Sequence, residues 1–221
     1  FVRFDYDMYK DESEVLSDHL ACALKGFKGL KRVHGSRDYF QFDNDDIKFE
    51  IVPVLKIKDP RKALNVTDIS PLHVIWVKKQ VKSDKNITDE IIITKQFFKA
   101  QKVYGAESYI AGFSGHVIDI LIVHFRKFET LLRKVMKWDL KKKTVIDHEK
   151  YYKNANEAMF SINRSKTESP VIVIDPIDRT RNASAALGKE KVLLLKKAAK
   201  KFIDNPQSEM FDIVKTTLAD I

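Results

Sequence analysis

The chain has 221 residues, enough for one or two domains, and 44% of them are hydrophobic, which suffices to build a core. Forty lysines and arginines against 31 aspartates and glutamates give a formal net charge of +9, which favours a polyanionic partner. A single cysteine excludes an internal disulfide and a cysteine-based zinc site. The longest apolar runs are too short to span a membrane, so we expect a cytoplasmic protein without a membrane partner.

The first part of the chain shows short patterns of strand and helix. A weakly alternating start indicates the end of a strand, and Ser13 is a candidate cap for a helix. A turn-rich stretch then separates two further strand patterns, which we expect to form a hairpin. The predicted elements are a strand at Phe1–Phe4, a helix from Glu14 to about Lys25, and strands at Tyr39–Phe42 and Ile47–Ile57.

Glu50 lies in the middle of an apolar strand pattern, Phe49-Glu50-Ile51-Val52-Pro53. A carboxylate buried there without a partner would be costly. Two interpretations remain open, a functional carboxylate or an exposed strand face with Lys48 as its neighbour. Asp5 and Asp7 also have a spacing typical of metal ligands, but they follow the first strand instead of lying inside it.

The segment after the predicted hairpin contains a helix start. Ser70 followed by Pro71 is a favourable pair for the cap and first position of a helix. Beyond that helix, the polar stretch Lys78–Asn86 indicates a linker. Thr88 is then the candidate cap of a second helix, which carries Lys95.

Three of the seven glycines punctuate the stretch from Lys95 to Phe125, at Gly105, Gly112 and Gly115. Lysines at helical spacing precede them, and an apolar helix pattern, Val117–Phe128, follows. A basic helix face beside a glycine turn and a helix start suits phosphate, because helix N-termini offer unpaired N–H groups. A solvated lysine face and an ordinary capped turn are the alternative.

The densest positive stripe of the sequence follows the apolar helix. It is either a solvated face or a set of contacts to RNA phosphates. Two short strand patterns, Thr144–Asp147 and Val171–Asp175, come next, and a basic amphipathic helix is predicted over Lys189–Phe202. The stripe consists of Arg126, Lys127, Arg133, Lys134, Lys137 and Lys141 to Lys143.

Four strings of the sequence resemble the archaeal-type (class I) CCA-adding enzymes, which are tRNA nucleotidyltransferases. VYGAE followed by GFSG and an apolar run is similar to the central domain of that family. FEIVP resembles its VDVVP strand, DISPLH its DRTPFH string, and DPIDRTRNASAALG its DPxDxxRNVAAxLS string. The strings occur in the order of the family, and the resemblance covers roughly residues 1 to 203.

The resemblance implies an α+β chain. Residues 1–59 would be the rear part of a nucleotidyltransferase palm, made of antiparallel strands plus a helix. Residues 60–187 would be a mainly helical central domain that binds nucleotide and tRNA, and residues 188–221 the first helix of a truncated third domain.

The resemblance also implies roles for single residues. Glu50 stands where the family has the third carboxylate of the catalytic magnesium pair, with glutamate in place of aspartate. The nucleotide-binding positions of the family fall on Ser70, His73, Lys95 and Tyr104, and Arg181 stands where an arginine helps to select the base. Because Lys95 and Tyr104 would face opposite ways on one unbroken helix, the helix must end near Gln101–Lys102, with Lys102 a candidate left-handed residue.

The implied function is the addition of CMP and AMP to the tRNA 3′ end from CTP and ATP, with Mg²⁺. In the family, the segment that resembles Phe1–Asp5 comes directly after two further catalytic carboxylates. We therefore expect a fragment or split subunit that needs a complementary N-terminal palm fragment. Within a tRNA-binding protein, Arg126, Arg133, Lys137 and Lys141 are the candidates for contacts to the acceptor end. The alternative is a non-catalytic RNA- or nucleotide-binding module derived from that family.

Overall fold

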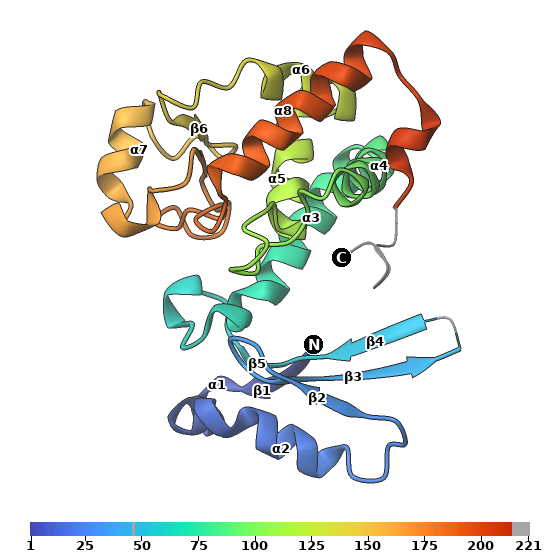
Figure 1. Cartoon of the computed structure of the whole chain (residues 1–221). Coiled ribbons are helices and arrows are strands. Elements are labelled where there is room, and N and C mark those ends of the chain that lie inside the picture. The colour runs from blue at the N-terminus through green and yellow to red at the C-terminus, as the bar shows by residue number, and fades with distance from the viewer. Residues whose placement is uncertain (46, 214–221) are drawn as a thin grey trace. The chain divides into compact units, whose positions relative to one another are not determined.

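The computed structural model describes residues 1–45 and 47–213, apart from the side chain of Arg164. The chain divides into two compact units, Phe1–Ile75 and Trp76–Ile221. Helices and strands are both present, and the strands form small sheets of two or three members (Figure 1). The predicted α+β class is therefore confirmed.

Unit 1 contains two small sheets. β1 (Val2–Asp5) pairs in parallel with β5 (Pro53–Lys56), and β2 (Lys31–Val33), β3 (Tyr39–Asn44) and β4 (Ile47–Ile51) form an antiparallel sheet in that order. Its helices are α1 (Tyr6–Tyr9), a 3-10 helix (Lys10–Val15) and α2 (Leu16–Ala23), followed by 3-10 turns at Pro60–Lys62 and Val66–Ile69. Buried Leu16 of α2 packs with Leu55 and Ile57 to form the core.

The predicted strand Ile47–Ile57 is wrong as a single element. The structure divides it into β4 and β5, which belong to different sheets. Pro53 has no N–H to continue an antiparallel ladder, and the chain changes partners there. The Val52 carbonyl instead accepts a hydrogen bond from the Val2 amide at 3.0 Å, which begins the parallel pairing of β5 with β1.

Four local predictions about helix ends are also corrected. Ser13 does not cap a helix, because it lies inside the 3-10 helix Lys10–Val15, and α2 follows it directly. α3 (Ser70–Ser83) covers most of the expected linker, and α4 (Asn86–Ala100) begins before Thr88, which therefore caps nothing. Ser70 has helical dihedral angles of −54° and −40°, so it is not the cap either.

Asn65 caps the turn that leads into α3. Its side chain accepts a hydrogen bond from the Thr67 amide at 3.0 Å, and Asp68 in return accepts from the Asn65 amide at 2.9 Å. This reciprocal arrangement is a capping box, which satisfies amide donors that a helix start leaves unpaired. The cap therefore lies one turn before the position that the Ser-Pro pair suggested.

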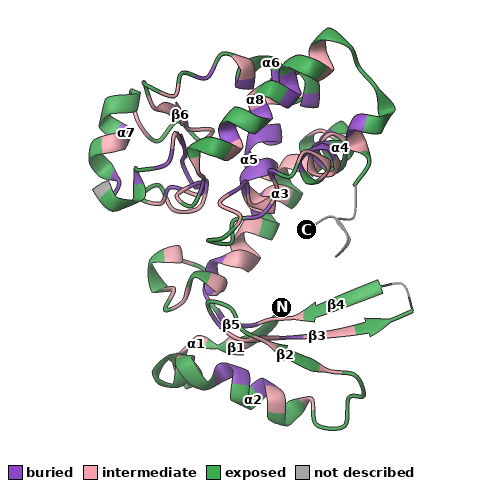
Figure 2. Ribbon diagram, viewed as in Figure 1, coloured by how far each residue is buried: buried purple, intermediate pink, exposed green. Residues whose placement is uncertain are grey.

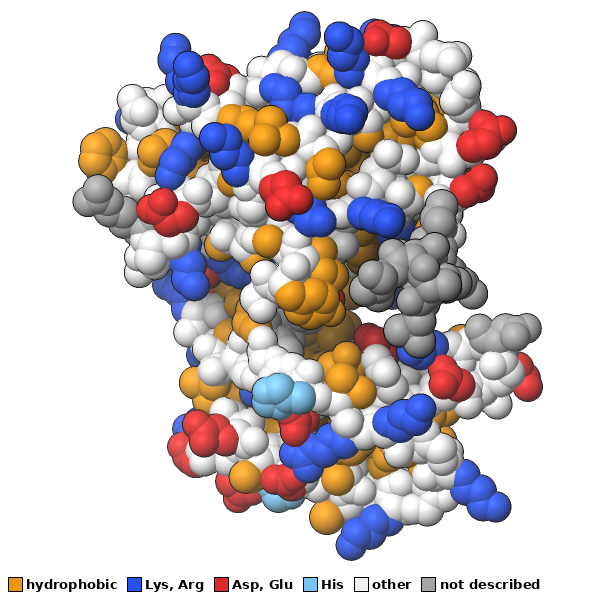
Figure 3. All heavy atoms as spheres, viewed as in Figure 1, with side chains coloured by type: hydrophobic (Ala, Val, Ile, Leu, Met, Phe, Trp, Pro, Cys, Tyr) orange, Lys and Arg blue, Asp and Glu red, His pale blue; other side chains and the backbone are white. Residues whose placement is uncertain are grey.

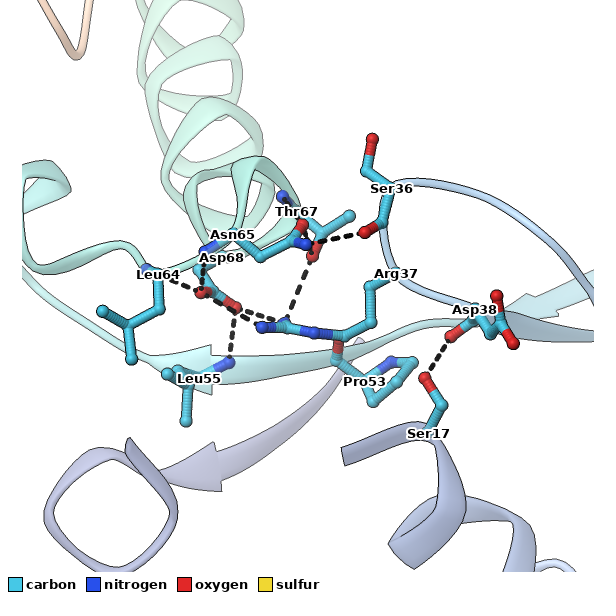
Figure 4. Close-up of polar contacts among 10 residues, drawn as sticks. All are labelled: Ser17, Ser36, Arg37, Asp38, Pro53, Leu55, Leu64, Asn65, Thr67 and Asp68. Carbon is cyan, nitrogen blue, oxygen red and sulfur yellow. Dashed lines mark hydrogen bonds and ion pairs between the residues drawn. The ribbon is translucent and has the colours of Figure 1, made fainter. Parts of the chain in front are cut away.

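A buried ion pair joins this turn to β5 of unit 1 (Figure 4). The Arg37 guanidinium donates to Asp68 at 2.5 Å, and the two side chains are 3% and 0% exposed. Arg37 also donates to the Pro53 carbonyl and the Thr67 hydroxyl, both at 3.2 Å. Asp68 in turn accepts from the Leu55 amide of β5 at 2.8 Å. The Arg37–Asp68 pair thus fixes the start of α3 relative to β5.

Unit 2 is built around α5 (Gly115–Phe125), whose residues are buried on nearly all sides (Figure 2). α4 and α6 (Phe128–Met136) pack against it, and α8 (Lys189–Asp204) packs against α6. The remaining elements are β6 (Thr144–Ile146), β7 (Val171–Val173), α7 (Ala155–Ser161) and 3-10 turns at Arg164–Lys166 and Ser208–Phe211; β6 and β7 pair in parallel.

The apolar helix predicted over Val117–Phe128 is present, but it begins earlier and ends earlier. Ser114 caps it by accepting from the Val117 amide, and Arg126 ends it with a left-handed φ of 70°. The structure divides the chain after Ile75 and packs α8 inside unit 2. The predicted domain boundaries lie between residues 59 and 60 and between residues 187 and 188. Those boundaries describe domains of the family, and they stay a prediction. No helix within the described residues is long and apolar enough to cross a membrane.

The buried pair generates a stability prediction. Arg37→Met should lower the free energy of unfolding by roughly 3–5 kcal/mol, because it leaves the Asp68 carboxylate buried without its cation. Arg32→Met is the matched control, since Arg32 pairs with Asp18 and Asp38 at the surface, where water screens the charges, and its loss should change stability much less. Urea denaturation of both variants checks this. Equal losses in the two would contradict a special role for the buried pair.

Candidate functional site

The chain reverses direction at the end of α4. The helix ends at Ala100, and Lys102 has a φ of 56°, in the left-handed region. This confirms the expected break near Gln101–Lys102. A non-glycine residue in this conformation costs about 1–2 kcal/mol. The Lys102 carbonyl accepts a hydrogen bond from the Lys191 ammonium at 3.0 Å, which ties the reversal to α8.

A closed loop follows between Tyr104 and Phe113, which form an isolated bridge. The Gly105 amide donates to the Phe113 carbonyl at 2.9 Å, and the Gly112 amide donates to the Gly105 carbonyl at 2.7 Å. A Cβ atom at Gly112 would lie 2.4 Å from the Val103 carbonyl oxygen. Only glycine therefore permits this close backbone approach, which brings the two ends of the loop together in front of α5.

Lys95 and Tyr104 meet at the first residue of α5. A Cβ atom at Gly115 would lie 2.8 Å from the Tyr104 hydroxyl oxygen and 3.8 Å from Lys95 Cε. Lys95 Nζ lies 2.7 Å from an Asp119 carboxylate oxygen one turn further along α5. An ammonium, a phenol hydroxyl and a helix N-terminus at one place form an arrangement that can bind an anion.

Arg181 is held by a buried carboxylate on the chain that follows β7. Its guanidinium pairs with Asp175, which is fully buried and also accepts from the Ile177 amide at 2.9 Å. The Tyr151 hydroxyl donates to the Pro176 carbonyl at 2.7 Å, and burial, with nearby carboxylates, raises the pKa of Tyr151. The turn that carries Arg181 is thereby fixed from two sides.

His116 connects these two groups of residues. It follows Gly115 in the first turn of α5, and a nitrogen of its ring lies within 4.8 Å of an Asp175 carboxylate oxygen. Lys95 and Tyr104 therefore meet at this helix start, and Asp175, which holds Arg181, approaches it at His116.

The other candidate residues for nucleotide and metal binding lie in unit 1. Ser70 and His73 are one turn apart on the first turn of α3, and both are half-buried. Glu50 is exposed on β4, opposite Gln41, whose amide donates to it at 2.8 Å. Asp5 is the last residue of β1 and caps α1, so the expectation that it follows the strand is wrong, whereas Asp7 lies in the first turn of α1, after the strand.

The basic stripe is partly neutralised within the protein. Arg126 lies 3.4 Å from Asp84, and Arg133 lies 2.5 Å from Glu129 on the same helix. Lys137 and Lys141 are exposed. The assignment of these four residues to tRNA stays a prediction, and the ion pairs reduce the charge that the two arginines offer.

Asp119, His116 and Asp175 were not among the predicted site residues. Asp119 could have been found from the sequence, because it is the one carboxylate in the mostly apolar helix pattern Val117–Phe125. Asp175 belongs to the DPID string, but its task of holding Arg181 depends on a turn that residue spacing does not show. His116 follows the glycine turn, and only the folded chain brings it to Asp175.

Comparison with known proteins identifies the family. Residues 89–212 match the model of the second domain of tRNA nucleotidyltransferases. The chain is 45% identical to the CCA-adding enzyme of Nanoarchaeum equitans over 164 residues, which are 74% of this chain and 41% of that protein. It is 38% identical to the Pyrococcus abyssi enzyme (73% and 36%) and 29% identical to the Methanocaldococcus jannaschii enzyme (100% and 49%). The chain thus spans half or less of the length of these relatives.

Two solved structures share the fold. A chain of the CdnC:HORMA-deltaN complex of E. coli MS115-1 superposes with a TM-score of 0.54 at 15% identity, covering 90% of this chain and 67% of that one. A cytoplasmic RNA terminal U-transferase superposes with a TM-score of 0.59 at 10% identity, covering 92% and 78%. Fold and site define a nucleotidyltransferase-like protein. With the matched family model, this chain belongs to the tRNA nucleotidyltransferase family.

The glycines at the site generate a prediction. Gly115→Ala should preserve stability, since the new methyl group meets the ends of the flexible Tyr104 and Lys95 side chains, but it should displace the hydroxyl and weaken the binding of an anion, with ATP as the probe. Gly112→Ala should destabilise the protein, because its methyl group meets backbone. Thermal unfolding and ATP titration of both variants separate the two effects. Gly115→Ala with Tyr104→Phe restores room beside the helix start, and unchanged ATP binding in Gly115→Ala alone would argue against this site.

Proposed function

We propose that the chain takes part in the addition of CMP and AMP to the 3′ end of tRNA from CTP and ATP, and that the first turn of α5 binds the triphosphate. The observation that carries the proposal is the meeting of Lys95, Tyr104 and the N-terminus of α5 at Gly115, in a member of the tRNA nucleotidyltransferase family. The similar archaeal proteins described above are named CCA-adding enzymes, which supports tRNA as the substrate.

In this proposal the phosphates lie at the helix start. Lys95 supplies positive charge, Tyr104 supplies a hydroxyl donor, and the first amides of α5 supply further donors. The nucleotide competes with Asp119 for the Lys95 ammonium, which lies 2.7 Å from that carboxylate. The assignment of Ser70 and His73 to the nucleotide stays a prediction from the family resemblance.

Arg181 is proposed to read the base. A guanidinium carries five N–H donors in a fixed plane, and the bond to Asp175 uses one of them while fixing the orientation of the group. The remaining donors suit the acceptor atoms at the edge of a nucleobase. This makes the protein, and not a nucleic-acid template, the source of base selection.

Metal binding needs residues beyond those in unit 1. Two-metal phosphoryl transfer uses several carboxylates to hold both ions, and Mg²⁺ prefers oxygen ligands. Glu50 is exposed, and within residues 1–45 and 47–75 no three histidine, cysteine or acidic side chains meet at metal-binding distance. We propose that Glu50 supplies one Mg²⁺ ligand and that a complementary palm segment supplies the others.

The nucleotide site has a direct test. Lys95→Ala should weaken ATP and CTP alike by roughly 1.5–3 kcal/mol, the size of a lost charge-assisted hydrogen bond. Arg181→Ala should change the preference between ATP and CTP more than the affinity for the shared phosphates. Calorimetric titration with both nucleotides measures these effects, with the exposed Lys78→Ala as the control. Parent-like affinity in Lys95→Ala would remove α5 from the proposal.

The role of Glu50 is tested in a mixture of the chain with a complementary palm segment. The parent chain should incorporate labelled CMP into tRNA that lacks CCA, and Glu50→Gln should not, because the amide keeps the shape but loses the charge that binds Mg²⁺. Glu50→Asp should retain activity, and Asp43→Asn, on the neighbouring strand, is the control.

Single-turnover incorporation compares the four forms, and tRNA binding should be the same in all of them. A Glu50→Gln variant as fast as the parent would make Glu50 an ordinary strand residue. Nucleotide binding without incorporation by the parent mixture would favour a non-catalytic module.

A further inference from the structure

A groove between α6 and α8 in unit 2 is lined almost entirely by lysines. It has a volume of about 550 Å³, and its lining is Met136 of α6 together with Lys196, Lys197, Lys200, Lys201 and Asp204 of α8. The aliphatic parts of these side chains form most of its wall, and four lysines against one aspartate give the surface around the groove an excess of positive charge. Lysine and arginine side chains also gather over the surface that α6 and α8 form (Figure 3).

The packing of α8 explains why these lysines share one surface. Val192, Leu195, Ala198 and Ala199 form the buried side of the helix, which packs against α6. Residues on the opposite side of α8 must therefore face outward. Lysines at positions 197, 200 and 201 are exposed, and Lys196 donates to the Trp138 carbonyl, which anchors the edge of the groove.

Three of these lysines form no ion pair with any residue that the structure describes. In the part of the chain that the structure describes, Lys197, Lys200 and Lys201 form no ion pair and no side-chain hydrogen bond. Lys196 and Lys200, and likewise Lys197 and Lys201, are like charges four residues apart, a spacing that destabilises a helix. The arginines of the neighbouring stripe, by contrast, pair with Asp84 and Glu129.

The spacing of the charges fits a phosphodiester backbone. Lys197 and Lys201 lie about 6 Å apart along the helix axis. One turn of α8 therefore places two ammonium groups within reach of neighbouring phosphates of an RNA strand. A row of uncompensated ammonium groups binds such a polyanion by releasing its counterions, without reading its sequence.

We propose that the α8 groove binds the phosphate backbone of the tRNA, at a place distinct from the nucleotide site at α5. This inference rests on the proposed function for the identity of the RNA. It assigns the main backbone contact to Lys197, Lys200 and Lys201, and it leaves Arg126 and Arg133 in their internal ion pairs.

The experiment measures the affinity of the whole chain for tRNA lacking CCA as a function of salt concentration, by fluorescence anisotropy. The test variant changes Lys197, Lys200 and Lys201 to Gln and keeps Lys196. The control variant changes Lys78, Lys79 and Lys82 to Gln, three lysines at comparable spacing on α3, so that both variants lose the same charge. Circular dichroism verifies that each variant is folded.

The groove variant should bind tRNA about tenfold more weakly or worse, and its log–log salt slope should fall by roughly two to three units, about one for each lost contact. The control should change little. Equal losses in both variants would overturn the proposal, because they would indicate general attraction by net charge. A groove-dependent binding of phosphatidylserine vesicles without any effect on tRNA would overturn it as well.

Titration of the same variants with ATP separates this inference from the proposed function. The groove variant should bind ATP as the parent does, since its lysines are not part of the α5 site. A parent chain that does not bind ATP would count against the proposed function alone. An unchanged tRNA salt slope in the groove variant would count against the inference about the α8 groove alone.

Discussion

The burial of α5 is the constraint around which unit 2 is organised. Six of its residues are buried, so α5 has almost no side left for solvent. A helix that is apolar all round must be enclosed by other elements. α4 and α6 pack directly against it. Its polar side chains are His116 and Asp119 near its start and the exposed His124 in its last turn. The helix start is therefore where polar groups meet the buried part of the unit.

That constraint also explains the order of elements in the sequence. Lys95 comes from the helix before α5, Tyr104 from the loop that closes in front of it, and Arg181 from the turn after β7. Each belongs to a segment that packs next to α5 or its first turn. In unit 1 the corresponding fixed point is the Arg37–Asp68 pair, which sets the start of α3 and with it the positions of Ser70 and His73.

Much of this arrangement could be predicted from the sequence, and the failures have physical causes. The apolar helix followed from periodicity, and the break at Lys102 followed from helix geometry together with the resemblance to a family. The roles of Lys95, Tyr104 and Arg181 come from that resemblance alone and stay predictions. The α3 cap was misplaced because Ser-Pro is locally as good a cap as Asn65, whose advantage comes from Asp68. The strand Ile47–Ile57 was misjudged because its two halves have the same pattern but different partners. The contact between His116 and Asp175 depends on tertiary packing, which spacing does not show.

The ion pair between Lys95 and Asp119 has a consequence for selectivity. A lysine that already has a carboxylate 2.7 Å away is partly neutralised, so a ligand must offer more than that carboxylate does. A small anion with one or two charges gains little by such an exchange. A triphosphate carries more charge and reaches the Tyr104 hydroxyl and the amides of α5 at the same time. Under the proposed function, Asp119 therefore sets a threshold that favours nucleoside triphosphates over monophosphates and inorganic phosphate.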